Sequence, residues 1–515
     1  MVAFWQAVRR DLLAFRERIV PSAPVMPGLY TYRFGDDCRQ SRVHLRIEPD
    51  RSGVLFVDVT DVVHLNATAA ELTSWAFDGI SKEQATSRLI ARHGSRCRFA
   101  WEQDLDAVYE MAARLASPED GCPTCSLASV ERAELFSTGI QAPYKADLAL
   151  TYDCNNDCPH CYNEADRLAM GLMSGEQWKQ VIAKLTEVGI PHLIFTGGEA
   201  TLHPDFLDIV SYADRLGPIC GLNTNARRLS QRSYTEELAK AGLNHVQVTL
   251  GSHRAAVHDR MMNARCFEQT VRGIENAIAS GMHTITNTTL MRMNAEEIEA
   301  TIEFLHSLGI RTFAINGMIY SGGGFDTGQA IPEQQMAPIL IGIRDKAKSL
   351  GMRFLWYTPT QYCRLSPVEL DIGAKRCNAG EYSLCVEPNG DVLPCQSYYV
   401  SAGNVLRDSW ESMWNGSLFK SFRERELDPQ ASGLPEMCWQ CPDLPLCGGG
   451  CRIEREAQSG IRVSGEPSRG CGGCGAGGCH TSPATTMGGF VSLDSLVLKT
   501  KRRGTGDFAN ATLYG

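Results

Sequence analysis

Short apolar runs separated by longer segments of helical periodicity mark the middle of the chain, between about residues 145 and 345. Strand-like runs lie at 147–152, 193–196, 219–223, 245–250, 284–290 and 312–316. Amphipathic helical patterns fall between them, for example from Glu176 to Glu187 and from Glu296 to Leu308. Strands that alternate with helices predict crossover connections and a parallel sheet. We therefore expect an α/β fold in this part of the chain.

The first 120 residues carry a different pattern, which predicts a separate domain. Two runs, 43–50 and 54–59, read as strands on either side of a tight turn. Helical patterns follow from Asn66, from Ser81 and over about 105–116. Strands followed by three helices predict a winged-helix-like α+β domain.

Two of these helices carry the spacing of a capping box, in which a side chain at each end satisfies a backbone amide of the other. The pairs are Thr68 with Glu71, and Ser81 with Gln84. The two pairs predict where the first and second helices begin.

The composition describes a globular chain with an unusual number of cysteines. Its 515 residues are 43% hydrophobic and 21% charged, and the formal net charge is −9. This charge disfavours nucleic acid as the main partner, and no apolar run predicts a secretory signal or a membrane span. We therefore expect a cytoplasmic protein. The 20 cysteines stand in short-spaced groups, which in that compartment indicate metal ligands.

Cys154, Cys158 and Cys161 form a C-x3-C-x2-C run directly after the strand expected at 147–152. Three thiolates so close together can hold three irons of a cubane [4Fe–4S] cluster. The fourth iron is then open and can bind a substrate or a cofactor. A zinc site usually takes four protein ligands, so the run favours the iron–sulfur cluster.

A glycine turn follows the strand expected at 193–196, as Gly197, Gly198 and Glu199. Glycine lets the backbone approach a ligand closely. Together with the cysteine run and its preceding strand, this turn resembles the radical S-adenosylmethionine (radical SAM) enzymes. The resemblance implies a partial (β/α)6 TIM-type barrel with its chemistry at the C-terminal ends of the strands. It also implies that the cysteine run holds the catalytic [4Fe–4S] cluster, whose open iron binds SAM.

The same resemblance implies contacts with SAM. His160 occupies the position where the family has an aromatic or histidine residue near the adenine. The glycine turn would contact the SAM amino group, with Glu199 as the acidic partner. Polar strand ends at 223–225, 247–249 and 287–289 offer further contacts to the ribose or carboxylate, or ordinary strand caps. Asn225 and Thr288 are the candidates chosen from them.

A second group of cysteines fills the C-terminal third. Its members are Cys377, Cys395, Cys438, Cys441, Cys447, Cys451, Cys471, Cys474 and Cys479. Their spacing, with Gly390 between the first two, resembles the SPASM extension of many radical SAM peptide maturases. A zinc ribbon would explain only the pair Cys438 and Cys441.

The SPASM resemblance implies two auxiliary [4Fe–4S] clusters. The first would be held by Cys377, Cys395 and Cys451, with Cys385 as fourth ligand or with an open iron. The second would be held by Cys438, Cys441, Cys447 and Cys471, with Cys474 and Cys479 as alternatives to the last. Cys363, just before the group, is a further spare candidate.

The segment from Val54 to Gly79 resembles the PqqD-like peptide-recognition domain typified by the pyrroloquinoline-quinone peptide chaperone. In that family a leader peptide adds as an extra strand to the edge of a sheet. The alternative is a winged-helix DNA binder, which the acidic charge disfavours.

The expected organisation has five parts. They are the leader-recognition domain at 1–120, a linker at 121–144 with Cys122 and Cys125, the radical SAM core at 145–345, the SPASM region at 346–480 and a polar tail at 481–515. The Cys122/Cys125 pair could be redox-active, metal-binding or part of a turn.

These features predict a radical SAM/SPASM maturase of a ribosomally made precursor peptide. The family chemistry implies reductive cleavage of SAM to a 5′-deoxyadenosyl radical, which takes a hydrogen atom from the peptide. The auxiliary clusters would accept an electron during a net oxidation, such as a thioether or C–C crosslink. Flavodoxin or ferredoxin would supply the electron that starts the reaction, and neither nucleic acid nor membrane is expected as a partner.

Three other functions stay open at this point. Enzymes with the same cysteine architecture act on tetrapyrroles and haem precursors. A redox-neutral peptide epimerase would need a hydrogen donor, for which Cys220 and Cys266 lie outside all cluster motifs. A redox-sensing DNA-binding regulator would use the clusters without needing a SAM site.

Overall fold

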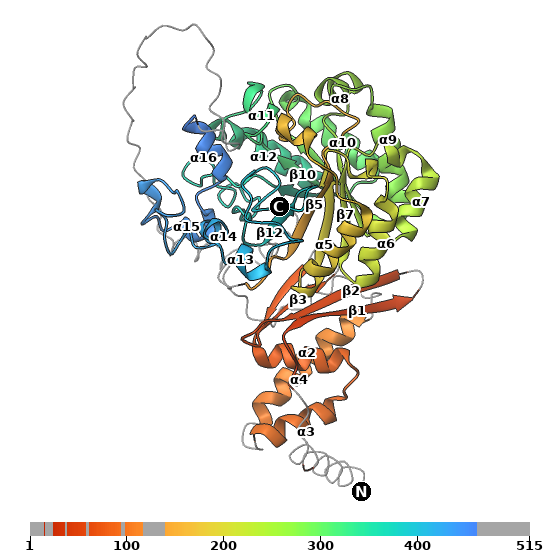
Figure 1. The fold of residues 1–515 in the computed structure, drawn as a ribbon, viewed down its shortest axis with the longest axis vertical. Coiled ribbons are helices and arrows are strands. Elements are labelled where there is room, and N and C mark those ends of the chain that lie inside the picture. The colour runs from red at the N-terminus through yellow and green to blue at the C-terminus, as the bar shows by residue number, and fades with distance from the viewer. Residues whose placement is uncertain are drawn as a thin grey trace.

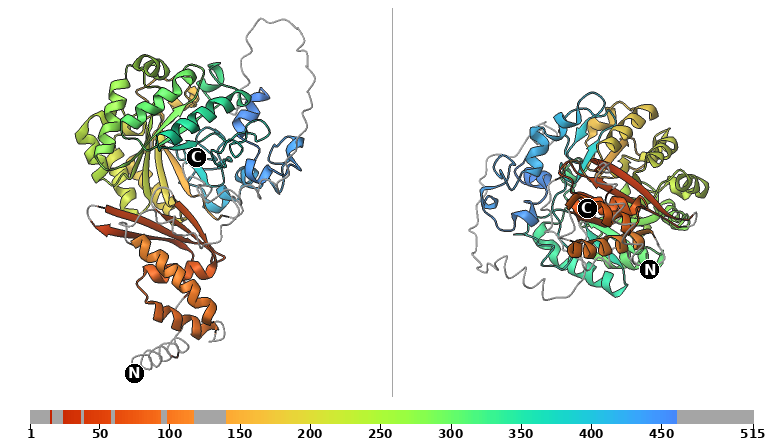
Figure 2. Two further views of the ribbon diagram at one scale, coloured as in Figure 1. Left: turned by 180° about the vertical axis from the view of Figure 1, so that it is seen from behind. Right: turned by 90° about the horizontal axis from the view of Figure 1, so that it is seen from below.

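The computed structural model of the chain describes residue 15 and residues 24–36, 39–57, 61–93, 98–116 and 140–460 (Figure 1). A small N-terminal body of strands and helices lies below a larger body, and the C-terminal elements lie on one side of the larger body. Figure 2 shows the same arrangement from behind and from below. The fold is mixed α/β, as predicted, with a parallel core sheet, an antiparallel N-terminal sheet and a C-terminal cysteine-rich region.

The N-terminal sheet is an antiparallel meander in the order β1-β2-β3-β4. Its strands are β1 (Gly28–Asp36), β2 (Arg39–Ile47), β3 (Gly53–Val57) and β4 (Asp61–Leu65). The sequence predicted only the middle two. In β1 the aromatic residues Tyr30, Tyr32 and Phe34 alternate with polar ones and pack on the apolar cluster under the sheet, which is the pattern we overlooked.

Three helices cover this sheet: α2 (Ala67–Phe77), α3 (Lys82–His93) and α4 (Arg98–Ala116). The capping box of α3 is confirmed, because the Ser81 amide donates to Gln84 Oε1 at 3.0 Å and the Gln84 amide donates to Ser81 Oγ at 3.3 Å. The box expected from Thr68 and Glu71 is wrong. Asn66 caps α2 instead, accepting from the Ala69 amide at 2.9 Å.

Six strands of the core lie within two residues of their predicted positions. They are β5 (Lys145–Thr151), β6 (His192–Gly197), β7 (Ile219–Thr224), β8 (His245–Thr249), β9 (His283–Thr289) and β10 (Thr312–Asn316). Consecutive strands are neighbours and pair in parallel. All six therefore present their C-terminal ends at the same edge of the sheet.

The core sheet continues past residue 345, where we expected the core to end. β11 (Arg353–Trp356) pairs in parallel with β10, and β12 (Ser383–Val386) pairs in parallel with β5. β13 (Val392–Leu393) closes the sheet antiparallel to β12. The cysteine-rich region is thus joined to the core by strand pairing.

Helices cover the outer face of the core sheet (Figures 1 and 2). They are α5 (Gly175–Glu187), α6 (Phe206–Leu216), α7 (Arg232–Lys240), α9 (Phe267–Ala279), α10 (Ile298–Ser307) and α12 (Glu333–Ser349). The helices α8 (Ala255–Met262) and α11 (Gly323–Asp326) lie at the C-terminal edge of the sheet, where Met262 and Gly323 hydrogen-bond with the loop of the cysteine run. α5 shows why they pack so: it starts at a Ser174/Gln177 capping box and buries Trp178 and Leu185 on one face. The C-terminal region adds α13 (Trp410–Trp414), α14 (Ser417–Arg423), α15 (Leu444–Cys447) and α16 (Arg452–Gln458).

The N-terminal sheet packs against the end of the core where the parallel strands begin. Val54 and Phe56 of β3 form an apolar cluster with Ile194 and Ile219. Beside it, the buried Arg42 guanidinium donates to Asp214 Oδ1 at 2.6 Å and to the Pro218 carbonyl at 2.7 Å. Buried apolar and charged contacts together hold the two bodies in one arrangement.

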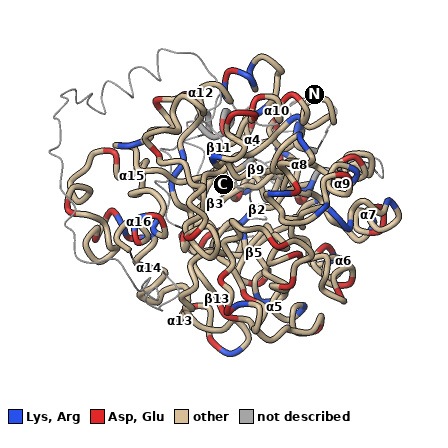
Figure 3. The backbone as a smooth tube through the Cα atoms, turned by 90° about the horizontal axis from the view of Figure 1, so that it is seen from above, with Lys and Arg blue, Asp and Glu red and all other residues tan. Residues whose placement is uncertain are grey.

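Among the described residues, no helix is both long enough and apolar enough to cross a bilayer. Lys and Arg are interspersed with Asp and Glu over the backbone tube in Figure 3. The mixed pattern agrees with the small acidic excess of the whole sequence.

Candidate active site

The loop after β5 carries the cysteine run to the C-terminal edge of the core sheet. Cys154, Cys158 and Cys161 all line one cavity there. A turn shapes the run, because the Cys161 amide donates to the Cys158 carbonyl at 3.0 Å. Burial raises the pKa of the Cys158 and Cys161 thiols, so a metal that binds them must displace protons.

Gly197 and Gly198 let β6 end in direct contact with this loop. A Cβ on Gly197, whose φ is +129°, would lie 2.1 Å from the Thr151 carbonyl oxygen. A Cβ on Gly198 would lie 2.4 Å from the carbonyl oxygens of Tyr152 and Asp153. The Gly198 amide donates to the Thr151 carbonyl at 2.7 Å, which fixes this approach. Both glycines also line the cavity, as predicted for a backbone that meets a ligand.

Glu199 lies behind the cavity wall instead of lining it. Its side chain is buried, and its carboxylate accepts hydrogen bonds from Thr201, Thr224 and the Asn225 amide. Burial raises its pKa, while these hydrogen bonds act in the opposite direction. The described contacts of the carboxylate are all with protein groups, and its charge acts on the nearby Cys154 thiol, so its role toward the SAM amino group stays a prediction. The carboxylate supports the loops that do reach the cavity.

His160 and Asn225 lie on the cavity wall, as expected for residues near a cofactor. Asn225 Nδ2 donates to Asn155 Oδ1 at 2.6 Å and lies 3.9 Å from the Cys154 sulfur. Burial lowers the pKa of His160 to about 4, so its imidazole is neutral near pH 7.

Thr288 does not line the cavity, and its role as a SAM contact stays a prediction. Its side chain is buried on the helix-covered side of β9 and donates to the Leu250 carbonyl at 2.7 Å. Its neighbours Asn287 and Thr289 line the cavity instead. Successive strand residues point to opposite faces, so Thr288 faces away from both neighbours.

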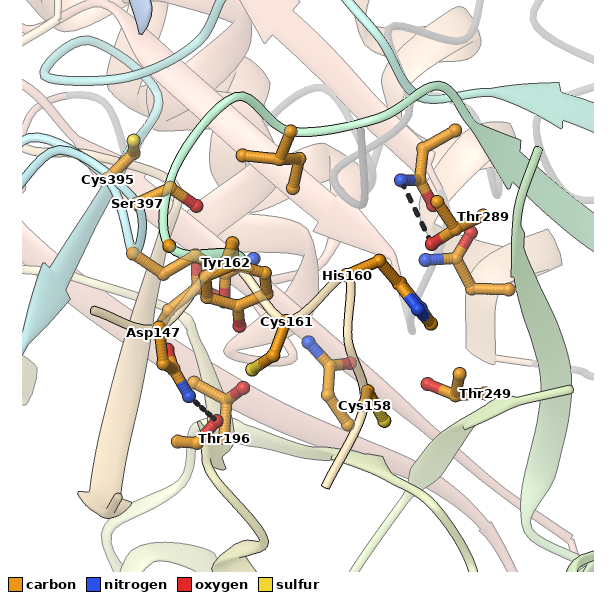
Figure 4. Close-up of a pocket in the computed structure, with 18 of the residues that line it drawn as sticks. Asp147, Cys158, His160, Cys161, Tyr162, Thr196, Thr249, Thr289, Cys395 and Ser397 are labelled. Carbon is orange, nitrogen blue, oxygen red and sulfur yellow. Dashed lines mark hydrogen bonds between the residues drawn. The ribbon is translucent and has the colours of Figure 1, made fainter. Parts of the chain in front are cut away.

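One cavity joins the cysteine run to three cysteines of the C-terminal group. Its volume is about 1380 Å³, and Cys377, Cys395 and Cys451 lie in its wall. Figure 4 shows Cys158 and Cys161 on one side of the cavity and Cys395 on another. Pockets for small ligands usually measure roughly 300–1,000 Å³, so this cavity has room for more than a single cofactor.

Polar side chains from the strand ends line the wall between the two cysteine groups. They are Gln247, Thr249, Asn287, Thr289 and Asn316. The side-chain oxygens of Asn287 and Asn316 are buried and have no hydrogen-bond partner among the described residues. Buried amide oxygens of this kind need a donor, and a ligand bound in the cavity can supply one.

Two cavity residues lie outside the predicted core and were missed. Burial lowers the pKa of Lys375 to about 7, and its amine lies 5.8 Å from the centre of the Tyr357 ring. Both side chains line the cavity. No motif marks them in the sequence, because β11 and the segment before Cys377 reach the cavity only in the folded chain.

Cys385 is part of an apolar cluster with Tyr152, Leu393 and Tyr399 and does not line the cavity. Cys395 is among the groups that raise the pKa of Cys385, so both options for the first auxiliary site stay open. Cys438, Cys441 and Cys447 lie together outside the cavity wall. Cys471, Cys474, Cys479, Cys122, Cys125 and the tail lie outside the described residues.

Neither candidate hydrogen donor reaches the cavity. Cys220 is buried in the main core, and Cys266 is buried behind α8 among methionines. Cys266 Sγ lies 3.4 Å from His258 Nε2, and its amide donates to Asp259 Oδ1. These contacts fix the start of α9.

The donor set at the loop after β5 fits a [4Fe–4S] cluster with one open iron. Three thiols face a cavity, the glycines leave room where side chains would clash, and unpartnered amide oxygens lie across from them.

Comparison with known proteins agrees with this geometry. The profile of the radical SAM superfamily matches residues 148–305, and that of SPASM, an iron–sulfur cluster-binding domain, matches residues 377–442. The chain is 29% identical over 327 residues to mycofactocin maturase MftC of Mycobacterium tuberculosis. The aligned region covers 62% of this chain and 80% of that protein. It is 27% identical over 364 residues to the PqqA peptide cyclase of Xanthomonas campestris pv. campestris, covering 67% and 89% respectively.

The fold is also similar to a solved structure. Streptococcus suis SuiB bound to S-adenosylmethionine superposes with a TM-score of 0.60 over 82% of this chain and 96% of that chain. The sequence identity is 16%, so this likeness shows the fold alone.

Proposed function

The chain is a radical SAM enzyme with a SPASM domain, related to peptide maturases, and we propose that it oxidatively crosslinks a ribosomally made precursor peptide. The bond formed would be a thioether or a C–C bond. The observation that carries the proposal is the shared cavity, which brings Cys377, Cys395 and Cys451 to face the same space as the cysteine run after β5. A substrate held there meets both groups.

In this proposal Cys154, Cys158 and Cys161 hold the catalytic [4Fe–4S] cluster. When bound and reduced, the cluster with SAM supplies a 5′-deoxyadenosyl radical that takes a hydrogen atom from a substrate carbon. Gly197 and Gly198 present backbone to the SAM amino acid group. The strand-end amides of Asn287 and Asn316 orient the rest of the cofactor and the substrate.

A net oxidation suits this cavity better than a redox-neutral reaction. An epimerase has to return a hydrogen atom to the substrate, and a cysteine thiol is the donor we considered. In the described part of the chain, every cysteine that lines the cavity belongs to one of the two cluster groups. In this proposal an auxiliary cluster can accept the electron at the cavity wall, whereas no cysteine outside the cluster groups lines the described cavity to donate a hydrogen atom.

The first auxiliary site would have an open iron toward the substrate. Cys377, Cys395 and Cys451 reach the cavity, while Cys385 is held in an apolar cluster by its β12 position. An open iron can bind a substrate thiolate, which would hold a cysteine of the peptide for crosslinking.

The N-terminal domain would bind the leader of the precursor by strand addition. Within the described residues, β1 and β4 each pair with one neighbour, so each leaves an edge to which an extended peptide can add. The contacts of Arg42 with Asp214 and Pro218 would hold this docking site at a fixed distance from the cavity.

The test is anaerobic reconstitution with iron and sulfide, followed by dithionite, SAM and short peptides encoded near the gene. Mass spectrometry follows 5′-deoxyadenosine and peptide mass. We expect deoxyadenosine together with a peptide that has lost two hydrogens. The Cys154→Ala/Cys158→Ala/Cys161→Ala variant should make neither.

A second variant separates the two cysteine groups. Cys377→Ala/Cys395→Ala/Cys451→Ala should still form deoxyadenosine but leave the peptide without a crosslink. Unchanged peptide mass with deuterium uptake from solvent would show epimerisation instead. Turnover of a haem precursor with no change in any peptide would favour the tetrapyrrole function.

A further inference from the structure

Cys438, Cys441 and Cys447 form a compact group that lacks a fourth ligand within the SPASM spacing up to Cys451. The Cys441 amide donates to the Cys438 carbonyl at 3.2 Å, so the first two cysteines share one turn. Cys447 ends the short helix α15. A [4Fe–4S] cluster with no open iron needs one more thiolate. The expected donor, Cys471, lies outside the described residues.

A segment that precedes the SPASM cysteines lies directly against this group. The Tyr362 amide donates to the Cys447 sulfur at 3.4 Å, and the Cys447 thiol lies 3.7 Å from the Thr360 carbonyl. The Cys451 amide donates to the Pro359 carbonyl at 3.0 Å. Residues 359–362 therefore follow the backbone of the cysteine loop, and Cys363 comes next.

Cys363 directly follows Tyr362, whose amide contacts the Cys447 sulfur, so the chain brings Cys363 to the side of this group. Burial, followed by the charges of neighbouring cysteines including Cys363, raises the pKa of Cys438. Burial and Cys363 also raise the pKa of Cys447, and Cys441 contributes to the raised pKa of Cys363.

The cavity group is separate from this one. Burial raises the pKa of the Cys451 thiol, and the cysteines that raise it further are Cys377 and Cys395. The three sulfurs of that group line the cavity, whereas Cys363 does not. Cys377, Cys395 and Cys451 thus lie on the cavity wall, whereas Cys438, Cys441 and Cys447 lie beyond it.

The turn that presents Cys363 is held from several sides. The Leu365 amide donates to the Gln361 carbonyl at 2.9 Å, and Arg364 Nη1 donates to Gln458 Oε1 on α16 at 2.8 Å. The Gln361 amide donates to Glu333 Oε1 at 3.2 Å. A ligand on an ordered turn loses little conformational freedom when it binds a metal.

We propose that Cys363 is the fourth ligand of the auxiliary cluster held by Cys438, Cys441 and Cys447. The inference rests on the SPASM assignment and goes beyond it in naming a ligand upstream of the cysteine motif. Four thiolates leave no open iron, so this cluster passes electrons and does not bind substrate. The Tyr362 amide beside Cys447 would help to set its reduction potential.

The test uses the full chain without peptide, so its outcome is independent of the proposed crosslinking. In the Cys154→Ala/Cys158→Ala/Cys161→Ala background only auxiliary clusters remain. Cys363→Ala is added to this background, and Cys471→Ala, Cys474→Ala and Cys479→Ala are added separately as matched comparisons. Iron per chain, Mössbauer spectra and low-temperature EPR of the oxidised and reduced proteins are measured.

We expect Cys363→Ala to lose between one and about four irons per chain and to gain the signal of an incomplete cluster. Cys363→Ser, which keeps a weaker oxygen ligand, should retain the iron with shifted EPR g-values. The three comparison variants should match their parent. Circular dichroism confirms that each variant is folded.

Double variants assign the effect to one cluster. Cys363→Ala should change nothing further when Cys438, Cys441 and Cys447 are already alanine. Full iron and parental spectra in Cys363→Ala, with loss in one of the comparison variants, would overturn the proposal. It would also be overturned if the effect of Cys363→Ala persisted without Cys438, Cys441 and Cys447, since Cys363 would then serve the cavity group.

Discussion

The backbone amide of Asn225 donates a 2.9 Å hydrogen bond to the buried carboxylate of Glu199. This bond ties the loop after β6 to the loop after β7. The acid of the Gly-Gly-Glu turn is thereby a positioning residue, which holds two adjacent loops of the cavity in register.

Glu199→Gln should therefore lower stability before it affects SAM chemistry. The amide nitrogen of glutamine would face a donor that the carboxylate now satisfies, which costs about 1–3 kcal/mol of unfolding free energy. Urea denaturation of the metal-free chain measures this loss, with the exposed Glu187→Gln as control. Unchanged stability together with a large loss of SAM affinity would instead show that Glu199 binds SAM directly.

Gly198→Ala should prevent the catalytic cluster from assembling. Its Cβ would lie 2.4 Å from two carbonyl oxygens of the loop that carries the cysteine run, and backbone cannot move aside as a side chain can. Iron analysis after reconstitution should show about four irons fewer than wild type. Gly171→Ala is the matched control, because no atom lies within 4 Å of its added Cβ. Equal iron content in the two variants would contradict the prediction.

Thr289→Val and Thr288→Val form a pair that tests which face of β9 meets the cofactor. Thr289 lines the cavity, so its variant should weaken SAM binding several-fold, as titration calorimetry of the reconstituted enzyme would show. Thr288 donates to the Leu250 carbonyl, so its variant should lose about 1 kcal/mol of stability and keep its SAM affinity. The reverse order of SAM affinities would exclude the cavity face as the cofactor site.

Arg42→Met should uncouple peptide binding from SAM cleavage. The substitution removes the guanidinium that holds the N-terminal sheet to Asp214, and we expect a loss of about 2 kcal/mol because Asp214 keeps a contact with Arg33. The KM for the precursor should rise, while deoxyadenosine formed without peptide stays unchanged. Arg114→Met on α4, whose guanidinium pairs with Glu110 of the same helix, is the control. An unchanged KM in Arg42→Met would argue against a docking role for this sheet.

Acid should loosen the same interface through His44. Burial lowers the pKa of His44 to about 4, and its Nε2 lies 3.0 Å from the Gly217 carbonyl. Because the unfolded chain takes up this proton near pH 6.5 and the folded chain only near pH 4, stability falls as the pH drops between these values. The slope is at most about 1.4 kcal/mol per pH unit.

The measurement is urea denaturation of the metal-free chain between pH 7 and pH 5. His44→Gln, which can still donate to Gly217, should show a shallower loss than wild type. His306→Gln on α10 serves as the control. Parallel pH dependence in wild type and His44→Gln would mean that other groups account for the acid effect.

The sequence predicted the core strands closely because their apolar residues are contiguous and their turns carry clear breaks. β10 was placed to the residue, and the cysteine run was correctly placed at the end of β5. β1 and β11 were missed because each contains an arginine that breaks the apolar pattern, and because the loops beside them pack only in the folded chain.

The site residues also differ in how far the sequence predicts their positions. Motif spacing is enough to gather Cys154, Gly197 and Cys377 around one cavity. Side-chain direction is not encoded in spacing, so the sequence could not foresee that Glu199 accepts from the Asn225 amide or that Thr288 donates to the Leu250 carbonyl. Nearness between distant segments, such as Tyr362 beside Cys447, has no signal in a single sequence.

The packing of Val54 and Phe56 on Ile194 and Ile219 fixes the distance between the N-terminal sheet and the cavity. This sheet covers the end of the core where the parallel strands begin, so a precursor docked on it, as proposed, would run around the outside to reach the cavity at the other end. β5 alone has 7 residues, which span about 23 Å. At least about seven extended residues must therefore separate the docked segment from the modified one. Precursors with a shorter spacer would bind without reacting, so spacer length becomes a criterion of substrate choice.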